Sequence, residues 1–350
     1  MRSLPWLVLV MAACGARTGL GVGVEPTDGG RDGGVDGALR DARADAAPNP
    51  CPPALVPTAV YAFSSGGMAI ALAQDETWLY AFRHTPNTNV GDLIRVPKCG
   101  GPETKLAGAI PTPSAIDVDA TRLYWIEGNA ASKVRAMAKT GGPIATLADV
   151  GTVPVPMLAL RGSRLYYQAS TNGTDVFIHE LALANQGSDG GIPDRTIGPS
   201  FGFFAVDDTW VYTRSKSLWL GAIPIAGGNV TDLAVAPTGG RIAVDGPDVY
   251  FTENPSFKQG EVWLTGMGRP AKRVRQKLDV PSGLALDATH VYVAEAGFDA
   301  GTGVVSRTPR AGGAVEVLAS AQDQPEILVV DDSSLYWLNY RGAIMKLDKP

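Results

Sequence analysis

The sequence contains few of the residues that bind metals and few charged residues. Only three of its 350 residues are histidine and three are cysteine, too few for a histidine-rich copper site or a zinc site built from four cysteines. Charged residues make up 19% of the chain, and the formal net charge is −5. This mild acidity argues against the basic surface that nucleic-acid-binding proteins use to contact phosphates. We therefore expect no cofactor, no metal site and no nucleic-acid partner.

Glycine and proline, in contrast, are abundant, with 42 and 26 residues. Hydrophobic residues make up 45% of the chain, which is enough to bury a large core in one domain of about 300 residues. Many turn-forming residues and few charges are typical of short strands joined by turns rather than of long helices.

The N-terminus has the pattern of a secretion signal. Arg2 provides a positive charge, and an apolar stretch follows at residues 4–10. A run of about ten residues is too short to cross a bilayer as a helix, which takes roughly 20, but it fits a signal peptide. The segment Met-Ala-Ala-Cys at 11–14 resembles the lipobox of bacterial lipoproteins. The resemblance implies cleavage before Cys14 and lipid attachment to it; ordinary secretion stays an alternative.

Residues 15–50 contain no aromatic residue and are rich in glycine, aspartate and alanine. Such a segment buries too little apolar surface to offset its conformational entropy, so we expect a flexible tether. We predict a signal peptide at 1–13, a lipid anchor and tether at 14–52, and a folded domain at 53–350.

One short phrase recurs seven times in the rest of the chain. A copy consists of an aspartate, three variable residues, an aliphatic residue and a tyrosine, as in Asp119-Ala-Thr-Arg-Leu-Tyr124. The tyrosines stand at positions 80, 124, 166, 212, 250, 292 and 336, which gives a period of about 43 residues, typical of a four-stranded propeller blade. Only the third copy lacks the aspartate, where Arg161 replaces it. We predict an all-β, seven-bladed β-propeller with strands A to D in each blade, A innermost.

The two ends of the repeat fit together. After Tyr336 the chain has room for one more strand, at 343–347, so the seventh blade lacks strand D. A spare strand at 58–63 precedes the first copy, and we expect it to complete the seventh blade and close the ring. Closure removes the exposed strand edges that invite aggregation.

The phrase Leu123-Tyr-Trp-Ile-Glu127 resembles the YWTD repeat of lipoprotein-receptor propellers, and residues 58–350 resemble more closely the repeat lipoproteins of myxobacteria. The acidic position of the repeat is filled by Glu127, Glu253 and Glu295, and by Asn339 in the last copy. In the resembled family this acid mainly ties strands and blades together by hydrogen bonds. The resemblance therefore implies a structural role, with a cation site as the alternative.

The start of strand A lines the central channel, where propeller enzymes commonly hold their ligands. Glu326 is the one ionisable residue at that position, and Arg241 lies one step further along its strand. Lactonase-like propellers hold a metal there through several oxygen ligands, and streptogramin-lyase-like propellers need a catalytic histidine with acidic partners. His84, His179 and His290 fall at unrelated blade positions. We predict no catalytic residue.

The aromatic residues divide into two groups. Trp125, Phe251 and Trp337 directly follow the repeat tyrosine, and we expect them to pack between blades. Trp78 and Trp210 fall in A–B turns and are weak candidates for a partner surface.

Once Cys14 is lipidated, two cysteines remain in an oxidising compartment. Cys51 precedes the closing strand, and Cys99 lies in the C–D turn of the first blade. The blade model puts both on the same face of neighbouring blades. It predicts a Cys51–Cys99 disulfide that stabilises the ring closure.

These observations favour a non-enzymatic outer-membrane lipoprotein, facing the periplasm or the outside, whose propeller binds a protein or glycan on one face. Two alternatives stay open: a propeller hydrolase or lyase of the lactonase or streptogramin-lyase type, and a purely structural envelope component.

Overall fold

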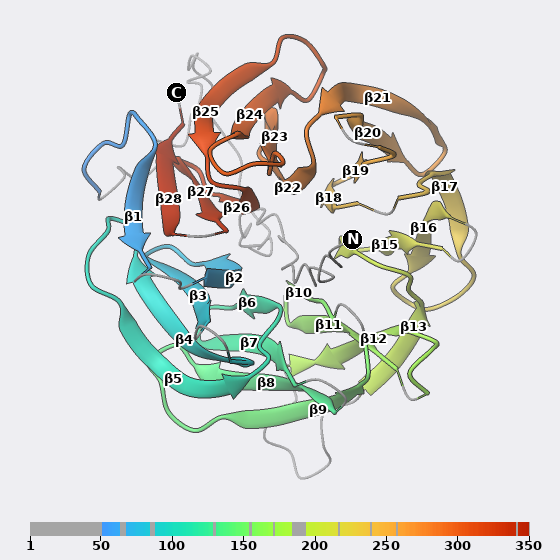
Figure 1. Ribbon diagram of the computed structural model, residues 1–350. Coiled ribbons are helices and arrows are strands. Elements are labelled where there is room, and N and C mark those ends of the chain that lie inside the picture. Colours follow the sequence, from blue (N-terminus) through green and yellow to red (C-terminus); the bar gives the residue numbers. More distant parts are fainter. Residues whose placement is uncertain are drawn as a thin grey trace, which may run out of the picture.

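The computed structural model is shown in Figure 1. It describes residues 51–63, 68–84, 88–128, 131–153, 156–170, 172–183, 194–215, 218–238, 240–256, 258–340 and 342–349. The predicted signal peptide, the lipidation site Cys14 and the predicted tether up to residue 50 lie outside these ranges. Within them, no helix has the length and apolar character needed to cross a membrane.

Seven antiparallel sheets of four strands each surround a central axis, as the sequence predicts. The first three blades are β2 (Met68–Gln74), β3 (Trp78–His84), β4 (Val90–Pro97), β5 (Thr104–Pro111); β6 (Ile116–Val118), β7 (Arg122–Glu127), β8 (Ser132–Ala138), β9 (Ala145–Gly151); and β10 (Leu158–Arg161), β11 (Arg164–Ala169), β12 (Phe177–Ala182), β13 (Asp194–Pro199). The next three are β14 (Phe204–Val206), β15 (Trp210–Arg214), β16 (Trp219–Pro224), β17 (Thr231–Val235); β18 (Ile242–Asp245), β19 (Asp248–Glu253), β20 (Gly260–Gly266), β21 (Arg269–Leu278); and β22 (Pro281–Leu286), β23 (His290–Glu295), β24 (Gly303–Pro309), β25 (Glu316–Gln322).

The seventh blade combines the two ends of the folded chain. It holds β26 (Pro325–Val330), β27 (Ser334–Asn339) and β28 (Ala343–Asp348) from the C-terminus, and β1 (Thr58–Ala62) adds the outermost strand. Thr58 pairs with Lys346 and Ala62 pairs with Ala343 across this seam. The predicted closure of the ring by the N-terminal strand is confirmed.

The core lies between neighbouring blades rather than in the middle of the ring. The inner strands contact one another around the channel, and apolar side chains from facing sheets fill the space between blades. In one such cluster Leu72 and Leu79 of the first blade pack with Ile327 and Leu338 of the seventh. The repeat tyrosines are fully buried, as are Trp125 and Trp337, so the expected core packing of these aromatic residues is confirmed.

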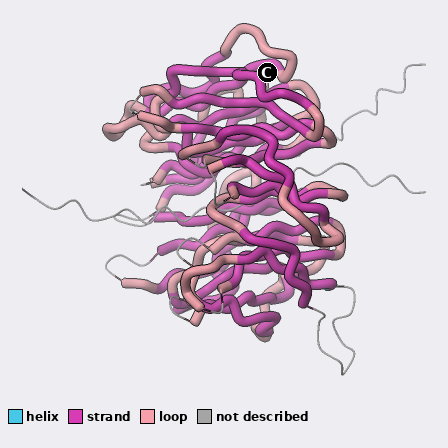
Figure 2. The backbone as a smooth tube through the Cα atoms, turned by 90° about the vertical axis from the view of Figure 1, so that its right-hand side faces the viewer, coloured by secondary structure: helices cyan, strands magenta, loops and turns pink. Residues whose placement is uncertain are grey.

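The strand directions give the disc two different faces. The A–B and C–D turns lie on one face, called here the turn face, while the B–C loops and the connections between blades lie on the other, the loop face. Figure 2 shows the disc from the side, with loops and turns gathered at its two faces. The C–D turn of the second blade needs glycine, because Gly141 and Gly142 have φ of 91° and 127°.

Candidate functional site

The repeat aspartate builds the A–B turn and also holds the repeat tyrosine. In the second blade the Asp119 Oδ1 accepts hydrogen bonds from the backbone nitrogens of Thr121 (2.6 Å) and Arg122 (2.7 Å), and Oδ2 accepts one from the Tyr124 hydroxyl (2.7 Å). Asp75, Asp207 and Asp287 make the same three bonds. Burial opposes ionisation, but these donors outweigh it and lower the pKa of Asp119. The turn role was predicted; the bond to the tyrosine was not.

In four places a cation from the following blade forms an ion pair with the repeat aspartate. The residue directly after strand C reaches back to the repeat aspartate of the preceding blade. The pairs are Lys98 with Asp331 (2.7 Å), Lys139 with Asp75 (2.5 Å), Lys349 with Asp287 (2.8 Å) and Arg310 with Asp245. Each pair joins two blades, so on this part of the turn face the charges serve to hold the ring together.

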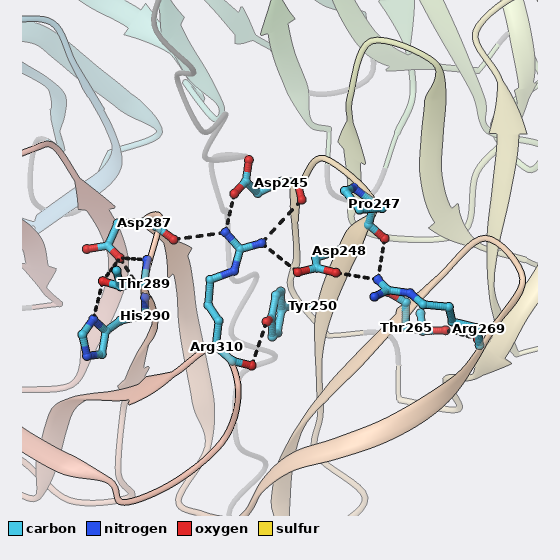
Figure 3. Close-up of polar contacts among 10 residues, drawn as sticks. All are labelled: Asp245, Pro247, Asp248, Tyr250, Thr265, Arg269, Asp287, Thr289, His290 and Arg310. Carbon is cyan, nitrogen blue, oxygen red and sulfur yellow. Dashed lines mark hydrogen bonds and ion pairs between the residues drawn. The ribbon is translucent and has the colours of Figure 1, made fainter. Parts of the chain in front are cut away.

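Figure 3 shows the most extensive of these contacts, between the fifth and sixth blades. The Arg310 guanidinium donates to the carboxylates of Asp245 and Asp248, the latter at 3.0 Å, and to the backbone oxygen of Asp287 at 3.3 Å. The Tyr250 hydroxyl donates in turn to the backbone oxygen of Arg310 at 3.3 Å. Burial opposes the charge on Arg310, but the Asp245 carboxylate outweighs it and raises the pKa of the arginine.

The acidic position of the YWTD-like phrase also has a structural role. The Glu127 carboxylate accepts hydrogen bonds from the Trp125 indole (2.8 Å) and from Arg135 (2.7 Å). Glu253 accepts a bond from the backbone nitrogen of Thr238 at 2.8 Å, and Glu295 accepts one from that of Asp279 at 2.9 Å. These bonds join two strands within a blade, or join a strand to the loop that connects two blades. They explain the glutamates as structural residues.

The histidines lie in separate blades and are not brought together. The His179 Nδ1 lies 3.1 Å from Asp194 Oδ1 in the third blade, and the His290 Nδ1 lies 2.7 Å from the Thr289 hydroxyl in the sixth. His84 ends β3 in the first. Among the residues that the structure describes, no three His, Cys, Asp or Glu side chains come together as a metal site.

Glu326 and Arg241 lie at the loop-face end of the channel wall, with Ser282 and Phe203 beside Arg241. The Arg241 Nε donates to the backbone oxygen of Ser282 at 2.7 Å, and its guanidinium carbon lies 5.0 Å from the centre of the Phe203 ring. Glu326 is only 9% exposed. Burial raises its pKa to about 7, against the opposing charge of Arg241. We call these four residues the channel mouth. Its carboxyl group, that of Glu326, has a pKa close to neutral pH.

Trp78 and Trp210 are the first residues of β3 and β15 rather than turn residues, and both are half-buried. The guanidinium carbon of Arg95 lies 4.5 Å from the centre of the Trp78 ring, and both Trp78 and Trp210 pack against the clusters between blades. A cation over the face of an indole covers it and is favourable. Most of each side chain therefore serves packing between blades, with the remainder exposed.

Four exposed apolar side chains lie at the loop-face edge of the third and fourth blades. Trp219 is 38% exposed beside its cross-strand partner Val235, at 58%, and the preceding Leu218, at 47%. Phe177 takes the equivalent position in the third blade and is exposed to 38%. We call these four residues the aromatic patch. Its sequence signature is the first residue of strand C, which is aromatic in these two blades and Val, Ser, Gly, Gly and Ala in the other five.

Cys51 and Cys99 form a disulfide with an S–S distance of 2.18 Å. The bond joins the segment before β1 to the C–D turn of the first blade, next to the seam where the ring closes. Beside it the backbone of Ala54 exchanges hydrogen bonds with Asp348, at 2.8 and 2.9 Å. The segment before β1 is therefore joined to the first blade by the disulfide and to the seventh blade by the hydrogen bonds with Asp348.

Comparisons with known proteins find similarity in structure only. No protein-family model and no curated protein matches the chain. The computationally designed protein Ika8 is similar over 85% of this chain and 100% of its own, with a TM-score of 0.58 and 12% identity. The propeller domain of the trilobed protease from Pyrococcus furiosus is similar over 80% and 95%, at 0.57 and 9%, and BamB from Moraxella catarrhalis over 81% and 84%, at 0.50 and 16%. At these identities the likeness shows the β-propeller fold alone.

Proposed function

We propose that this protein is a non-enzymatic lipoprotein of the outer membrane whose propeller binds a protein or a glycan. The lipobox-like segment at 11–14 and the composition of the residues up to 52 support an anchor at Cys14 followed by a tether. The domain that follows is a rigid ring with two large faces, and propellers of this kind serve many roles as scaffolds.

The aromatic patch is the observation that carries the binding role. Trp219, Val235 and Leu218 lie together on the surface and contribute little to the core. Interfaces are enriched in tryptophan and phenylalanine, because these side chains bury a large area at a low cost in conformational entropy. On the turn face, by contrast, ion pairs between blades use much of the polar surface. We therefore place the partner on the loop face.

Site-specific crosslinking in the native host tests this placement. A photoreactive amino acid at position 219 is expected to give an adduct, while one at position 317 is not. Val317 is a matched control, because it is 60% exposed and lies near the turn-face end of β25. Digestion of the adduct with a protease or a glycosidase then distinguishes a protein partner from a glycan. The absence of any adduct at 219, with the chain folded and exported, would favour a purely structural component.

The proposed anchor has a separate test. Growth with a clickable fatty acid is expected to label the wild-type chain in the membrane fraction. Cys14→Ser is expected to lose the label, because the acyl chains are attached at this cysteine. A Cys14→Ser protein that kept the label would contradict lipid attachment at this residue.

One observation favours a propeller enzyme as a second candidate. The Glu326 carboxyl, with its pKa raised to about 7 by burial, has the acidity that general acid–base catalysis at neutral pH requires. A thermal-shift screen with divalent metals separates the two candidates. Stabilisation by one metal that is lost in Glu326→Ala would favour the enzyme.

A further inference from the structure

The contacts between blades change character at the seam between the third and fourth blades. Arg161 replaces the repeat aspartate there, and Ile225 stands directly after strand C, where four other blades have a cation. Instead of the usual pair, the Arg161 guanidinium forms a two-point ion pair with Asp208 of the fourth blade, at 2.8 and 3.0 Å. The repeat has lost both members of its ion pair at this one seam.

A pocket of about 600 Å³ opens on the turn face at this seam. It is lined by Arg164, Arg195, Asp208, Thr209, Ile225 and Ala226. The volume lies within the range of about 300–1,000 Å³ typical of small-molecule sites. The arginines come from the third blade and the other four residues from the fourth, so a ligand here would contact both blades.

The two arginines of the pocket share a buried carboxylate, that of Glu180. Glu180 is 4% exposed and accepts hydrogen bonds from Arg164 and from Arg195, the latter at 2.5 Å. The same Arg195 Nη2 donates to the backbone oxygen of Ile225 at 2.6 Å. The Nε and Nη1 of Arg195 take no part in these bonds. Both arginine side chains are about half exposed, so some of the NH groups of each guanidinium face the pocket.

The charges of the seam favour a singly charged anion. Among the residues that line the pocket, two arginines (164 and 195) stand against one acid, Asp208. A guanidinium matches the planar, two-oxygen geometry of a carboxylate. The exposed Asp208 carboxylate would repel the second charge of a phosphate, but it can accept hydrogen bonds from neighbouring hydroxyl groups.

We propose that this pocket binds the carboxylate of an acidic sugar, a hexuronate. Arg164 and Arg195 receive the carboxylate, Asp208 and the Thr209 hydroxyl bond the ring hydroxyls, and Ile225 contacts the apolar face of the ring. The site goes beyond the proposed function, because it lies on the opposite face of the disc from the aromatic patch and would operate whether or not that patch has a partner.

Titration of the full chain with glucuronate and galacturonate, followed by calorimetry or NMR, tests the proposal. Saturable binding of a hexuronate is expected, with no binding of neutral glucose at the same concentrations. Ala226→Glu places a competing carboxylate in the pocket that Arg164 and Arg195 line, and Ala226 is exposed. It is expected to weaken binding by about tenfold or more, equivalent to about 1.4 kcal/mol. The matched control is Ala311→Glu, the equivalent turn position of the sixth blade, which is expected to bind like the wild type.

A second pair of variants tests the arginine itself. Arg195→Gln is expected to lose hexuronate binding, whereas Arg269→Gln is expected to retain it. Arg269 is a matched control, because it also lies at the beginning of a strand D, pairs with a carboxylate (Asp248, as Arg195 pairs with Glu180) and is similarly exposed. Unchanged binding in Ala226→Glu, equal binding of glucose, or binding of inorganic phosphate or a short peptide in place of the hexuronate would overturn the proposal. None of these outcomes bears on crosslinking at position 219.

Discussion

The Lys98 ammonium donates a hydrogen bond to the Asp331 carboxylate at 2.7 Å, across the seam where the first and seventh blades meet. The lysine side chain is 7% exposed and also lies 5.2 Å from the centre of the Tyr336 ring. The next residue, Cys99, forms the disulfide to Cys51. Two consecutive residues therefore hold the ring closure, one by an ion pair and one by a covalent bond.

Replacing Lys98 by methionine should weaken the closure. The change keeps most of the apolar stem but leaves the partly buried Asp331 without its cation, and such a loss costs about 2 kcal/mol in the free energy of unfolding. Urea denaturation at pH 7 measures the effect. The control is Lys133→Met, whose pair with Asp149 is largely exposed and is expected to contribute less than about 0.5 kcal/mol. Equal effects of both substitutions would contradict the role of Lys98.

Reduction of the Cys51–Cys99 bond should also destabilise the domain. The bond closes a loop with a sequence separation of 48 residues, for which the chain-entropy model gives about 4 kcal/mol. Urea denaturation with and without a reductant measures the loss, and Cys99→Ser is expected to match the reduced wild type. If reductant lowered the stability of Cys99→Ser as well, an effect other than this bond would be responsible.

The repeat aspartates predict loss of stability in acid. Burial opposes ionisation of Asp287, but Lys349, the Tyr292 hydroxyl and two backbone NH groups outweigh it, so its pKa is lowered from 3.8. The pKa values of Asp75, Asp119 and Asp331 are lowered as well. Because the folded pKa lies below the unfolded one, the stabilisation is complete above the unfolded value and is lost as the pH falls from that value through the folded pKa.

We therefore expect the stabilisation by these aspartates to be level from pH 7 to about pH 5 and to fall steeply below about pH 4. The urea midpoint should show this in a Glu326→Gln background, which lacks the carboxyl group whose pKa burial raises to about 7. Asp287→Asn should be less stable than the wild type by about 2 kcal/mol at pH 7, and the difference should shrink towards pH 3. A difference that stays constant over this range would show that the charge of Asp287 is not what stabilises the ring.

The buried Glu326 carboxyl group predicts the opposite pH dependence of stability. Burial raises its pKa from 4.5 to about 7, so the folded state binds the proton more tightly than the unfolded chain. The carboxyl group therefore destabilises the fold progressively as the pH rises from 4.5 to about 7. Glu326→Gln should be more stable than the wild type by up to about 3 kcal/mol at pH 8 and equal to it at pH 4.

Denaturation of Glu326→Gln at both pH values checks this, with Glu76→Gln as the control. Glu76 lies exposed in an A–B turn, and its substitution is expected to change stability little at either pH. A Glu326→Gln protein that was less stable at pH 8 would mean that the charged carboxylate has a partner in the channel mouth.

The sequence by itself determined the architecture. The repeat from Asp119 to Tyr124 is local, since five residues separate two side chains that meet within one hairpin, and its period counts the blades directly. The spare strand at 58–63 determined how the ring closes, because a four-stranded blade that lacks one strand has one edge to fill. These features follow from strand alternation and turn chemistry, which neighbouring residues decide.

Only the tertiary structure decided which side chains meet between blades. Lys98 and Asp331 lie 233 residues apart, and nothing in the local sequence of either selects its partner. The same holds for the pocket, where the departures at Arg161 and Ile225 gain a meaning only once two blades are packed together. The candidate sites lie on surfaces formed between repeats, while the periodic sequence describes each repeat alone.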